Sequence, residues 1–271
     1  MYKITDEEFT LLANYIKAQS GINLRAEKKT LLVSRLSHVL RDLGIEDFKT
    51  YYKYLLKDEE GLEISRLIDR ITTNHTYFMR EADHFRYLTE TVLPFWDENI
   101  KDSDLRVWCA ASSSGEEAYT LAILLEEYFG KRMISWDKKI LATDLSKSIL
   151  DKAKAGVYSQ DQVASLPKNW QLNYFDKEAG DRVKVKDRLK REVIFRRFNL
   201  LENQFPFKRK FHVIFCRNVM IYFDNETKEK LIEKLYDALE YGGYLFIGQS
   251  ESINKAQTRF KYIKPAVYRK I

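Results

Sequence analysis

The stretch from Leu105 to Tyr119 combines a loop of small residues with acidic side chains. An apolar run, Leu105 to Cys109, leads into the small residues 110–115, and an apolar helical pattern follows at once. Small residues at the carboxyl end of a first strand let the backbone approach a ligand closely. A dinucleotide fingerprint needs three glycines so that a pyrophosphate can sit on the helix N-terminus, whereas this loop has only Gly115. We therefore expect a ligand without a pyrophosphate.

Two acidic residues, Asp144 and Glu117, are candidates for holding that ligand. Asp144 ends the next apolar run, where an acidic side chain of a doubly wound sheet typically binds ribose hydroxyls. Its spacing from Gly115 exceeds the typical ~20 residues, so the spacing alone argues little. Glu117 has a second explanation, because acids stabilise helix N-termini by ~0.3–1 kcal/mol. Together the two acids favour a ligand with a ribose and positive charge, such as S-adenosylmethionine, over a nicotinamide dinucleotide.

Two further polar clusters occur where clefts form. Residues 72–81 gather hydroxyls, an amide, aromatic rings and Arg80 at a junction between two differently patterned regions. Just past the apolar run 211–216, three polar side chains interrupt an apolar segment at the ligand-binding edge of the expected sheet: Arg217, Asn218 and Tyr222. An interdomain linker and caps for loop carbonyls are the structural alternatives for the two clusters.

The elements that must position these residues divide the chain in two. Residues 1–91 contain helical patterns over 5–20, 28–43, 47–56 and 62–71 and no strand signal, which predicts a small helical domain that includes the junction. In 92–271, apolar runs at 105–109, 139–143, 193–198, 211–216 and 244–248 alternate with helical patterns at 116–129, 147–154 and 227–239. This alternation predicts an α/β fold with a doubly wound, Rossmann-like parallel sheet. Residues 157–192 break it, and a turn at 179–181 indicates an inserted antiparallel β-hairpin subdomain.

Composition limits the class of protein further. The chain has 271 residues, 45% of them hydrophobic, a formal charge of +6 and two cysteines, which is enough for one large or two modest domains. We expect buried thiols and a reducing compartment, because both cysteines lie in apolar runs. No segment has the ~18 consecutive apolar residues of a membrane span, and the acidic start is unlike a signal peptide, so we expect a cytoplasmic protein. The four histidines lack ligand spacing, so we expect no metal.

Taken in order along the chain, these segments resemble the CheR family of chemotaxis receptor methyltransferases. The resemblance rests on 73–80 (TNHTYFMR), 112–117 (SSSGEE), 142–144 (ATD) with 156–158 (GVY), 198–200 (FNL), 216–224 (CRNVMIYFD) and 248–251 (GQSE). It implies methylation of glutamate side chains on the cytoplasmic helices of bacterial chemoreceptors, with S-adenosylmethionine as cofactor and S-adenosylhomocysteine as product.

By position in the motifs, the resemblance implies a set of site residues. Those assigned to the cofactor are Asn74, Thr76, Arg80, Glu117, Asp144, Asn199, Leu200, Arg217 and Asn218. Arg80 and Tyr222 match the family's candidates for positioning the substrate. The short loop at 178–181 differs from the longer, glycine-containing loop of members that dock on a receptor pentapeptide, so we expect docking that is independent of a pentapeptide.

Two alternative functions stay open. A nucleic-acid methyltransferase of the same fold would use the basic surface, but enzymes that methylate exocyclic base amines resemble one another in an Asn-Pro-Pro-aromatic motif, and here Val219 and Met220 follow Asn218. A receptor-binding module without catalysis is the other alternative, and the intact polar motifs argue against it. We expect a monomer that binds no nucleic acid and does not insert into membranes.

The positive charge is concentrated in two segments. Residues 24–42 carry five Lys or Arg against two acids, and residues 177–197 carry nine against four, so the two windows sum to +8 and leave about −2 for the remaining chain. We expect the faces around Lys28, Lys29 and Arg35, and the 177–197 hairpin, to meet the acidic helices of a receptor.

Overall fold

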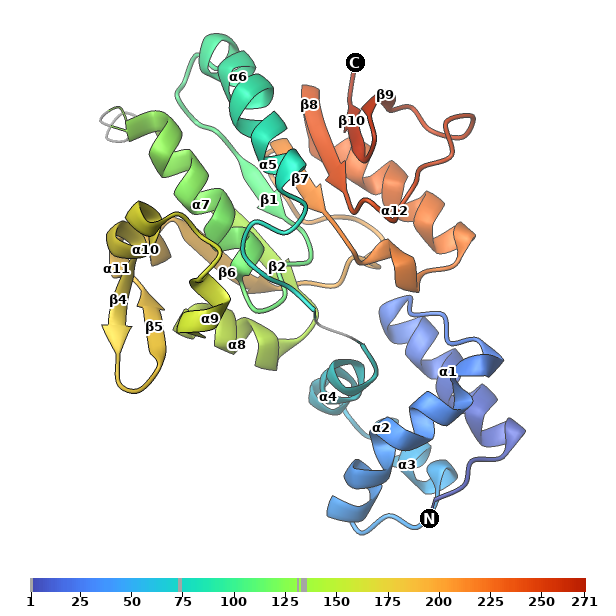
Figure 1. The fold of residues 1–271 in the computed structure, drawn as a ribbon. Helices are drawn as coiled ribbons and strands as arrows, with labels where there is room; N and C mark the ends of the chain where they lie inside the picture. Colours follow the sequence, from blue (N-terminus) through green and yellow to red (C-terminus); the bar gives the residue numbers. More distant parts are fainter. Residues whose placement is uncertain (1, 73–74, 131, 133–135) are drawn as a thin grey trace.

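The computed structural model describes residues 2–72, 75–130, 132 and 136–271 (Figure 1). At the N-terminal end, four helices and a short 3-10 turn gather into one helical unit, apart from the sheet. They are α1 (Asp6–Ser20), η1 (Ala26–Lys28), α2 (Lys29–Asp42), α3 (Phe48–Leu55) and α4 (Leu62–Ile71). Helix α1 begins with a capping box between Thr5 and Glu8 and ends at Gly21, as the sequence predicts.

The helical unit has its own apolar core, which draws one stripe from each helix. Its buried members include Leu12, Leu36, Phe48 and Leu67, and the last of them along the described chain is Ile71. Helix α5 (Ala82–Tyr87) and most of the π-helical segment η2 (Leu88–Val92), which the sequence groups with the helical domain of residues 1–91, pack into the core of the sheet instead, as does α6 (Leu93–Asn99), which was expected there. The break between the two cores therefore precedes residue 78, not residue 91.

The larger unit is built on a seven-stranded sheet with the order β6-β2-β1-β7-β8-β10-β9. Five strands are parallel, as expected: β1 (Val107–Cys109), β2 (Ile140–Asp144), β6 (Val193–Arg197), β7 (Phe211–Cys216) and β8 (Leu239–Ile247). Two antiparallel strands, β10 (Val267–Arg269) and β9 (Lys261–Lys264), extend it and were not expected. The α/β, doubly wound fold class is confirmed.

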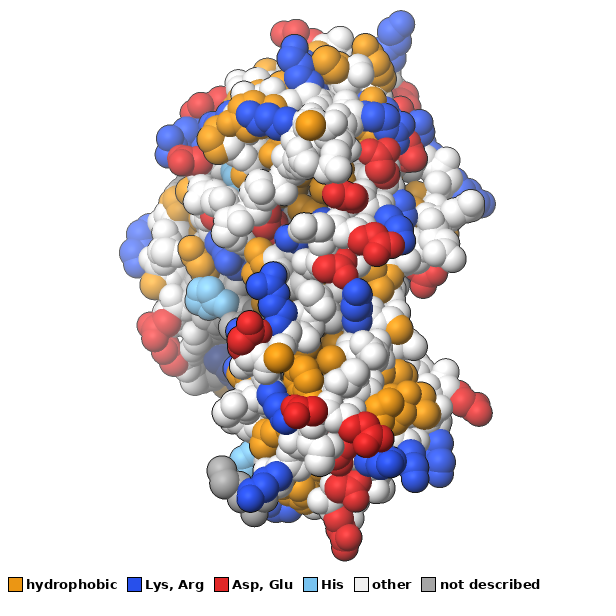
Figure 2. All heavy atoms as spheres, turned by 90° about the vertical axis from the view of Figure 1, so that its right-hand side faces the viewer, with side chains coloured by type: hydrophobic (Ala, Val, Ile, Leu, Met, Phe, Trp, Pro, Cys, Tyr) orange, Lys and Arg blue, Asp and Glu red, His pale blue; other side chains and the backbone are white. Residues whose placement is uncertain are grey.

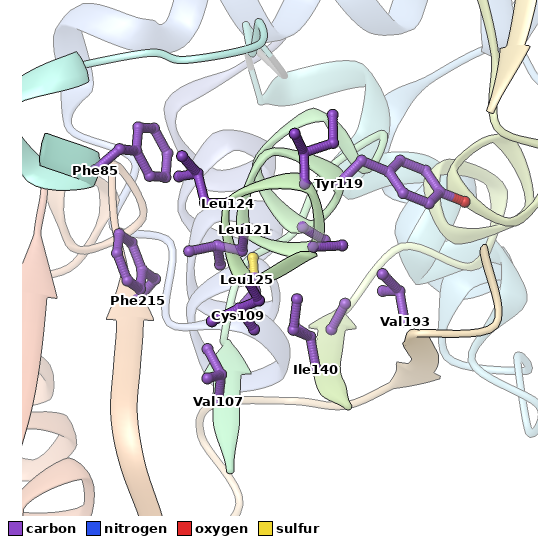
Figure 3. Close-up of a cluster of buried hydrophobic side chains, with 14 of the residues drawn as sticks. Phe85, Val107, Cys109, Tyr119, Leu121, Leu124, Leu125, Ile140, Val193 and Phe215 are labelled. Atoms are coloured by element: carbon purple, nitrogen blue, oxygen red, sulfur yellow. The ribbon is translucent and has the colours of Figure 1, made fainter. Parts of the chain in front are cut away.

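Both faces of the sheet are covered. Helix α7 (Glu116–Phe129) packs with Val107 and Cys109 of β1, while Trp108 between them points into the cluster that contains α12 (Asn225–Ala238). Figure 3 shows leucines of α7 meeting strand residues of the sheet, with Phe85 of α5 beside Phe215 of β7. The Phe85 and Phe215 rings are stacked with centroids 5.7 Å apart, which ties α5 to the sheet.

The expected insertion is present and is larger than a hairpin. It forms a three-stranded antiparallel sheet, β3-β5-β4, with short helices around it. Its elements are β3 (Val157–Ser159), α9 (Gln160–Val163), α10 (Lys168–Tyr174), β4 (Phe175–Glu178), β5 (Arg182–Val185) and α11 (Asp187–Lys190), and it follows α8 (Lys147–Ala155). The turn between β4 and β5 contains Gly180 at φ +73°. Among the described residues, no helix is long and apolar enough to cross a membrane.

The helical unit docks on the sheet through backbone as well as side chains. Ile22 forms an antiparallel bridge with Phe223, and the Asn23 amide donates to the Tyr222 carbonyl at 2.8 Å. The side-chain amide of Asn199 donates to the Gln19 carbonyl, and Lys17 pairs with Asp224 at 2.6 Å. These contacts place the end of α1 over the carboxyl ends of the parallel strands.

Candidate functional site

A cavity of about 320 Å³ lies at the carboxyl ends of β1, β2, β6 and β7, where a doubly wound sheet binds its ligands. Ser20 and Ile22, at the end of α1, and Ile68 and Asp69, on α4, contribute to its wall, so the helical unit completes it. The cavity also contains most of the residues that the sequence assigns: Thr76, Arg80, Glu117, Asp144, Asn199, Leu200, Arg217, Asn218 and Tyr222. Asn74, the remaining assigned residue, lies outside the described residues.

Asp144 ends β2 and fixes the loop after β1. Its carboxylate accepts hydrogen bonds from the Ser113 amide at 2.9 Å and from the Ser146 amide at 3.0 Å. Burial raises the pKa of Asp144 above its ordinary 3.8, and these amide donors only partly oppose the shift. The carboxylate is thus rigidly placed at the edge where a ribose is expected.

The inserted sheet supports the small-residue loop from behind. Gly115 has φ +100°, and a Cβ there would lie 3.0 Å from both Ala153 and the Tyr158 hydroxyl. The Tyr158 hydroxyl also donates to the Ser114 carbonyl at 2.8 Å. Only glycine fits this position, because a side chain would meet both the strained backbone angle and the packed neighbours.

A buried arginine connects three segments around Glu117. Arg217, after β7, pairs with Glu117 at 2.6 Å and with Glu81 at 3.0 Å, and it lies over the Phe85 ring. Burial alone would lower the pKa of Arg217, but the two carboxylates outweigh it and raise the pKa. Arg217 therefore stays charged, and its side chain is bound to these two acids and to the Arg80 carbonyl.

The junction segment brings Arg80 and Thr76 to the cavity. Arg80 donates to the His75 carbonyl and lies over the Tyr77 ring, 6.0 Å from its centroid. Tyr77 is 46% exposed, so the ring beside Arg80 is open to solvent. The junction is thus a wall of the cavity and not only a linker.

Asn199 and Leu200 follow β6, which is separated from β7 by β2 and β1 in the sheet, whereas the Arg80 carbonyl is bonded to Arg217 just after β7. The Asn199 side chain is held at both ends, since its amide donates to Gln19 and its oxygen accepts from the Leu201 amide at 3.0 Å. Nearby, Arg197 donates to the carbonyls of Leu145 and Gly61. The segment after β6 is thus a junction of the two units.

Three acidic residues of this region were not among the predicted site residues. Glu81 forms an ion pair with Arg217 and accepts hydrogen bonds from the Asn218 side chain and the Gln249 backbone amide. Glu251 binds the loop after β7 through backbone amides. Asp69 lines the cavity and accepts from the Ser148 hydroxyl across the two units. The TNHTYFMR motif lies next to Glu81, and the GQSE motif contains Glu251. The hydrogen bonds that Glu81 and Glu251 form with Asn218 span 137 and 33 positions of the chain, so the motifs alone do not reveal them.

The residues present fit S-adenosylmethionine. The cavity size is that of a small-molecule site. Its acidic side chains, Asp144, Asp69 and Glu117, suit ribose hydroxyls and the positive charges of an ammonium and a sulfonium, and its loop after β1 lacks the glycines that a pyrophosphate needs.

A second, wider groove of about 1270 Å³ adjoins the cavity. It runs between α2 and α4 on one side and α8 and the inserted sheet on the other, and it shares Asp69, Thr72 and His75 with the cavity. The groove is lined by the cations Arg35, Arg66, Arg70, Lys152 and Arg182 and by the acids Asp42, Glu63, Asp69 and Glu116. It therefore gives a large ligand a route to the cavity.

Comparison with known proteins points to one family for the whole chain. Residues 7–72 match the all-alpha domain of CheR methyltransferases, and residues 74–269 match the SAM binding domain of the same enzymes. A chemotaxis protein methyltransferase of Borreliella burgdorferi is 42% identical over 98% of this chain and 95% of its own length. One of Salmonella typhimurium is 34% identical over 98% of this chain and 90% of its own.

Proposed function

Because this chain belongs to the CheR methyltransferase family, with S-adenosylmethionine as its cofactor, we propose that it methylates glutamate carboxylates on the cytoplasmic helices of bacterial chemoreceptors. The observation that carries the proposal is the pair of connected spaces. A cavity whose residues fit the cofactor opens into a groove large enough for a helical segment of a protein.

In the proposed site, Asp144 holds the ribose, while Asn199 and Leu200 form the adenosine end. Glu117 faces the methionine ammonium, and Thr76 and Arg80, with Asn74, complete that end from the junction. Arg217 acts mainly by fixing Glu117, to which it is paired at 2.6 Å. Asn218 lies beside these groups on the cavity wall.

The reaction needs no general base. A glutamate side chain has an ordinary pKa of about 4.3 and is already ionised at neutral pH. When bound, S-adenosylmethionine supplies a methyl group activated by its sulfonium. The protein's task is to align the carboxylate oxygen with that methyl and to exclude water, and such positioning can supply up to ~7–11 kcal/mol.

Arg80 and Tyr222 are the proposed positioning groups at the mouth. The Arg80 guanidinium, held by His75 and Tyr77, orients the incoming carboxylate or the cofactor's carboxylate. The Tyr222 backbone is bonded to Asn23 of the helical unit, which supports a fixed place for its ring at the methyl-transfer cleft. Arg80→Ala and Tyr222→Phe should therefore each slow methyl transfer at saturating cofactor.

Receptor docking is assigned to the groove and its basic rim. Arg35 and Arg182 line the groove from opposite sides, which supports docking between the helical unit and the inserted sheet. Lys29 contributes less, because it is paired with Asp6 at 2.6 Å, while Lys28 is exposed just before α2 begins. In the hairpin, Lys184, Lys186 and Arg188 are paired with acids, so only part of its charge faces a partner. The short β4–β5 turn supports docking without a receptor pentapeptide.

The test is transfer of tritium from methyl-labelled S-adenosylmethionine to a receptor fragment that carries its methylation helices. We expect label on the fragment that base releases as methanol, and no transfer with the Arg80→Ala variant above a small fraction of the wild-type rate. A base-stable product on nucleic acid would refute the proposal in favour of a nucleic-acid methyltransferase. Binding of receptor with no transfer at all would indicate a non-catalytic signalling module.

A further inference from the structure

The turn after β8, residues 248–251, is hydrogen-bonded to the loop after β7, which carries Asn218 and Tyr222. Glu251 accepts hydrogen bonds through one carboxylate oxygen from the amides of Asn218, at 2.9 Å, and Gly248, at 2.6 Å. Its other oxygen accepts from the Ile221 amide at 3.2 Å. One side chain therefore fixes both ends of the segment 218–221. Glu251 itself does not line the cavity.

Gly248 lets the two segments approach this closely. A Cβ at Gly248 would lie 2.5 Å from the Asn218 side-chain nitrogen, 2.9 Å from the Glu251 carboxylate and 3.0 Å from the Asn218 amide. Real Cβ atoms do not approach such atoms below 3.0 Å. Any side chain at residue 248 must therefore displace Asn218 or break its bond to Glu251.

The surrounding contacts fix an uncommon backbone conformation of Asn218. It has φ +57°, in the left-handed region, which asparagine adopts more readily than most non-glycine residues but still uncommonly. Its backbone amide donates to Glu251 and its side chain donates to Glu81 at 3.2 Å, so two carboxylates bind this one residue. An uncommon backbone conformation at a ligand-lining residue persists where the surroundings fix it.

We propose that Glu251 is a positioning residue for methyl transfer, which acts by holding Asn218 and the segment leading to Tyr222 in register with the cofactor cavity. The proposal rests on the function proposed above, since it takes the Asn218–Tyr222 segment as part of the methyl-transfer cleft. Glu251 holds the alignment of this segment and contacts neither cofactor nor substrate. We call these hydrogen bonds of Glu251 the Glu251 clamp. A misplacement of about 1 Å can cost ~100-fold in rate, so a small shift of the clamped segment should slow methyl transfer even where the cofactor still binds.

Two substitutions break the clamp in different ways. Glu251→Gln keeps the shape of the side chain but turns an amide donor toward backbone donors, and Gly248→Ala pushes on Asn218 directly. Ser252→Ala is the matched control, because Ser252 is the exposed neighbour of Glu251. The measurements are the single-turnover rate of methyl transfer to a receptor fragment at saturating cofactor, the affinity for S-adenosylhomocysteine by calorimetry, and the thermal midpoint of each full-length variant.

We expect both clamp variants to lose at least ~10-fold in single-turnover rate while affinity for S-adenosylhomocysteine falls by no more than ~3-fold, with Ser252→Ala unchanged in both. Wild-type rates in folded Glu251→Gln and Gly248→Ala would overturn the proposal, and so would equal losses of rate and affinity. If Glu251→Gln does not fold, the Gly248→Ala result decides by the same criteria. Full activity of Asn218→Ala and Tyr222→Phe would instead refute the proposed function of the cleft, independently of the clamp.

Discussion

At the scale of single residues, the site depends on acids in contrasting surroundings. Glu81 and Asp144 are both withdrawn from water, which raises a carboxyl pKa. At Glu81, the charge of Arg217 and several hydrogen bonds outweigh this burial and lower its pKa, whereas at Asp144 burial prevails. Glu81 is thus a fixed structural charge, whereas Asp144 takes up a proton at a higher pH than an ordinary aspartate does.

This difference predicts how cofactor affinity depends on pH. If Asp144 accepts ribose hydroxyls as a carboxylate, binding favours its charged form and lowers its pKa in the complex. The cofactor then binds with full affinity at pH values above the raised pKa of Asp144 in the free protein. The affinity falls as the pH drops through that pKa, which lies above the ordinary value of 3.8. Calorimetric titration with S-adenosylhomocysteine between about pH 7.5 and about pH 4.5 measures this. In Asp144→Asn the affinity should be lower and nearly flat over that range; an unchanged slope would assign the pH dependence to another group.

The pairing of Arg217 predicts a large effect on stability. Replacing Arg217 by Met leaves the Glu81 and Glu117 carboxylates in a buried region without their shared cation. Removal of one partner from a buried ion pair typically costs ~3–5 kcal/mol, so we expect a loss of that order in the free energy of unfolding by urea. Lys230→Ala, which removes an exposed pair with Glu226, should change stability little. If Arg217→Met changed the free energy of unfolding only slightly, Glu81 and Glu117 would have to become protonated or hydrated at no cost in stability.

At the scale of elements, the helices and strands that could be predicted from the sequence are those whose own residues show a complete hydrophobic pattern. The bounds of α7 and β7 agree with the predicted 116–129 and 211–216, because each is a long apolar pattern buried on the sheet. Strands β9 and β10 were missed, since both are short and depend on strand pairing, β10 with β8 and β9 with β10, and β9 is also largely exposed or half-buried. Helix α5 was predicted as part of the helical unit, although it packs on the sheet. The spacing of apolar residues along a helix indicates that one face is buried, but not which element covers that face.

The same limit applied to the site. Residues just past strand ends, such as Asp144 and Asn218, were predictable because the fold collects strand ends at one edge. Glu251 and Asp69 were not, since their importance lies in contacts with segments far away in the sequence. Of the motif residues, Arg217 was expected at the cofactor, whereas its side chain is occupied by Glu81 and Glu117.

The end of α1 gives a prediction for the contact between the units. Gly21 has φ +76°, and a Cβ there would lie 2.9 Å from Leu201 and 3.1 Å from Phe223. Gly44 also has a positive φ, +66°, but a Cβ there would meet no atom of the described residues within 4 Å. Gly44→Ala should cost ~1–2 kcal/mol from backbone strain alone. Gly21→Ala should cost a further ~1–3 kcal/mol in urea unfolding, because it also overpacks the interface.

Affinity for the cofactor separates the two glycine variants as well. Ser20 and Ile22, on either side of Gly21, line the cavity, so a shift of this turn should weaken binding of S-adenosylhomocysteine. Gly44 and its neighbours in the chain are not part of the cavity lining, so the Gly44→Ala variant should bind normally. Equal stability losses and equal affinities in the two variants would contradict the close packing of α1 on the loop that contains Leu201.

At the scale of the whole molecule, the arrangement of charge matters more than the net +6. Figure 2 shows acidic and basic side chains interspersed over the face seen there. The groove, in contrast, brings together cations from α2, α4, α8 and the inserted sheet, which are far apart in the sequence. Acids at Asp42, Glu63 and Glu116 partly balance them, so the field of the groove is patterned and not uniformly positive.

This pattern predicts that charge reversal in the groove affects receptor encounter and leaves cofactor binding intact. Arg35→Glu and Arg182→Glu each place an acid where acidic receptor helices are proposed to enter, and neither residue lines the cofactor cavity. We expect the association rate with a receptor fragment to fall several-fold in each, most strongly at low ionic strength, because exposed charges are screened over ~10 Å at about 0.1 M salt. Lys28→Glu should act in the same direction, and Lys29→Glu should act less specifically, because it also loses its partner Asp6.

Stopped-flow association at several salt concentrations, with calorimetry for S-adenosylhomocysteine, measures both effects. Lys230→Glu on α12 is the control, because it changes the net charge by the same amount away from the groove. If the control slows association as much as Arg35→Glu and Arg182→Glu do, the net charge of the molecule and not the groove attracts the receptor. A loss of cofactor affinity in the groove variants would show that the groove and the cavity are not independent. Asp69, Thr72 and His75, which line both spaces, would then explain the coupling.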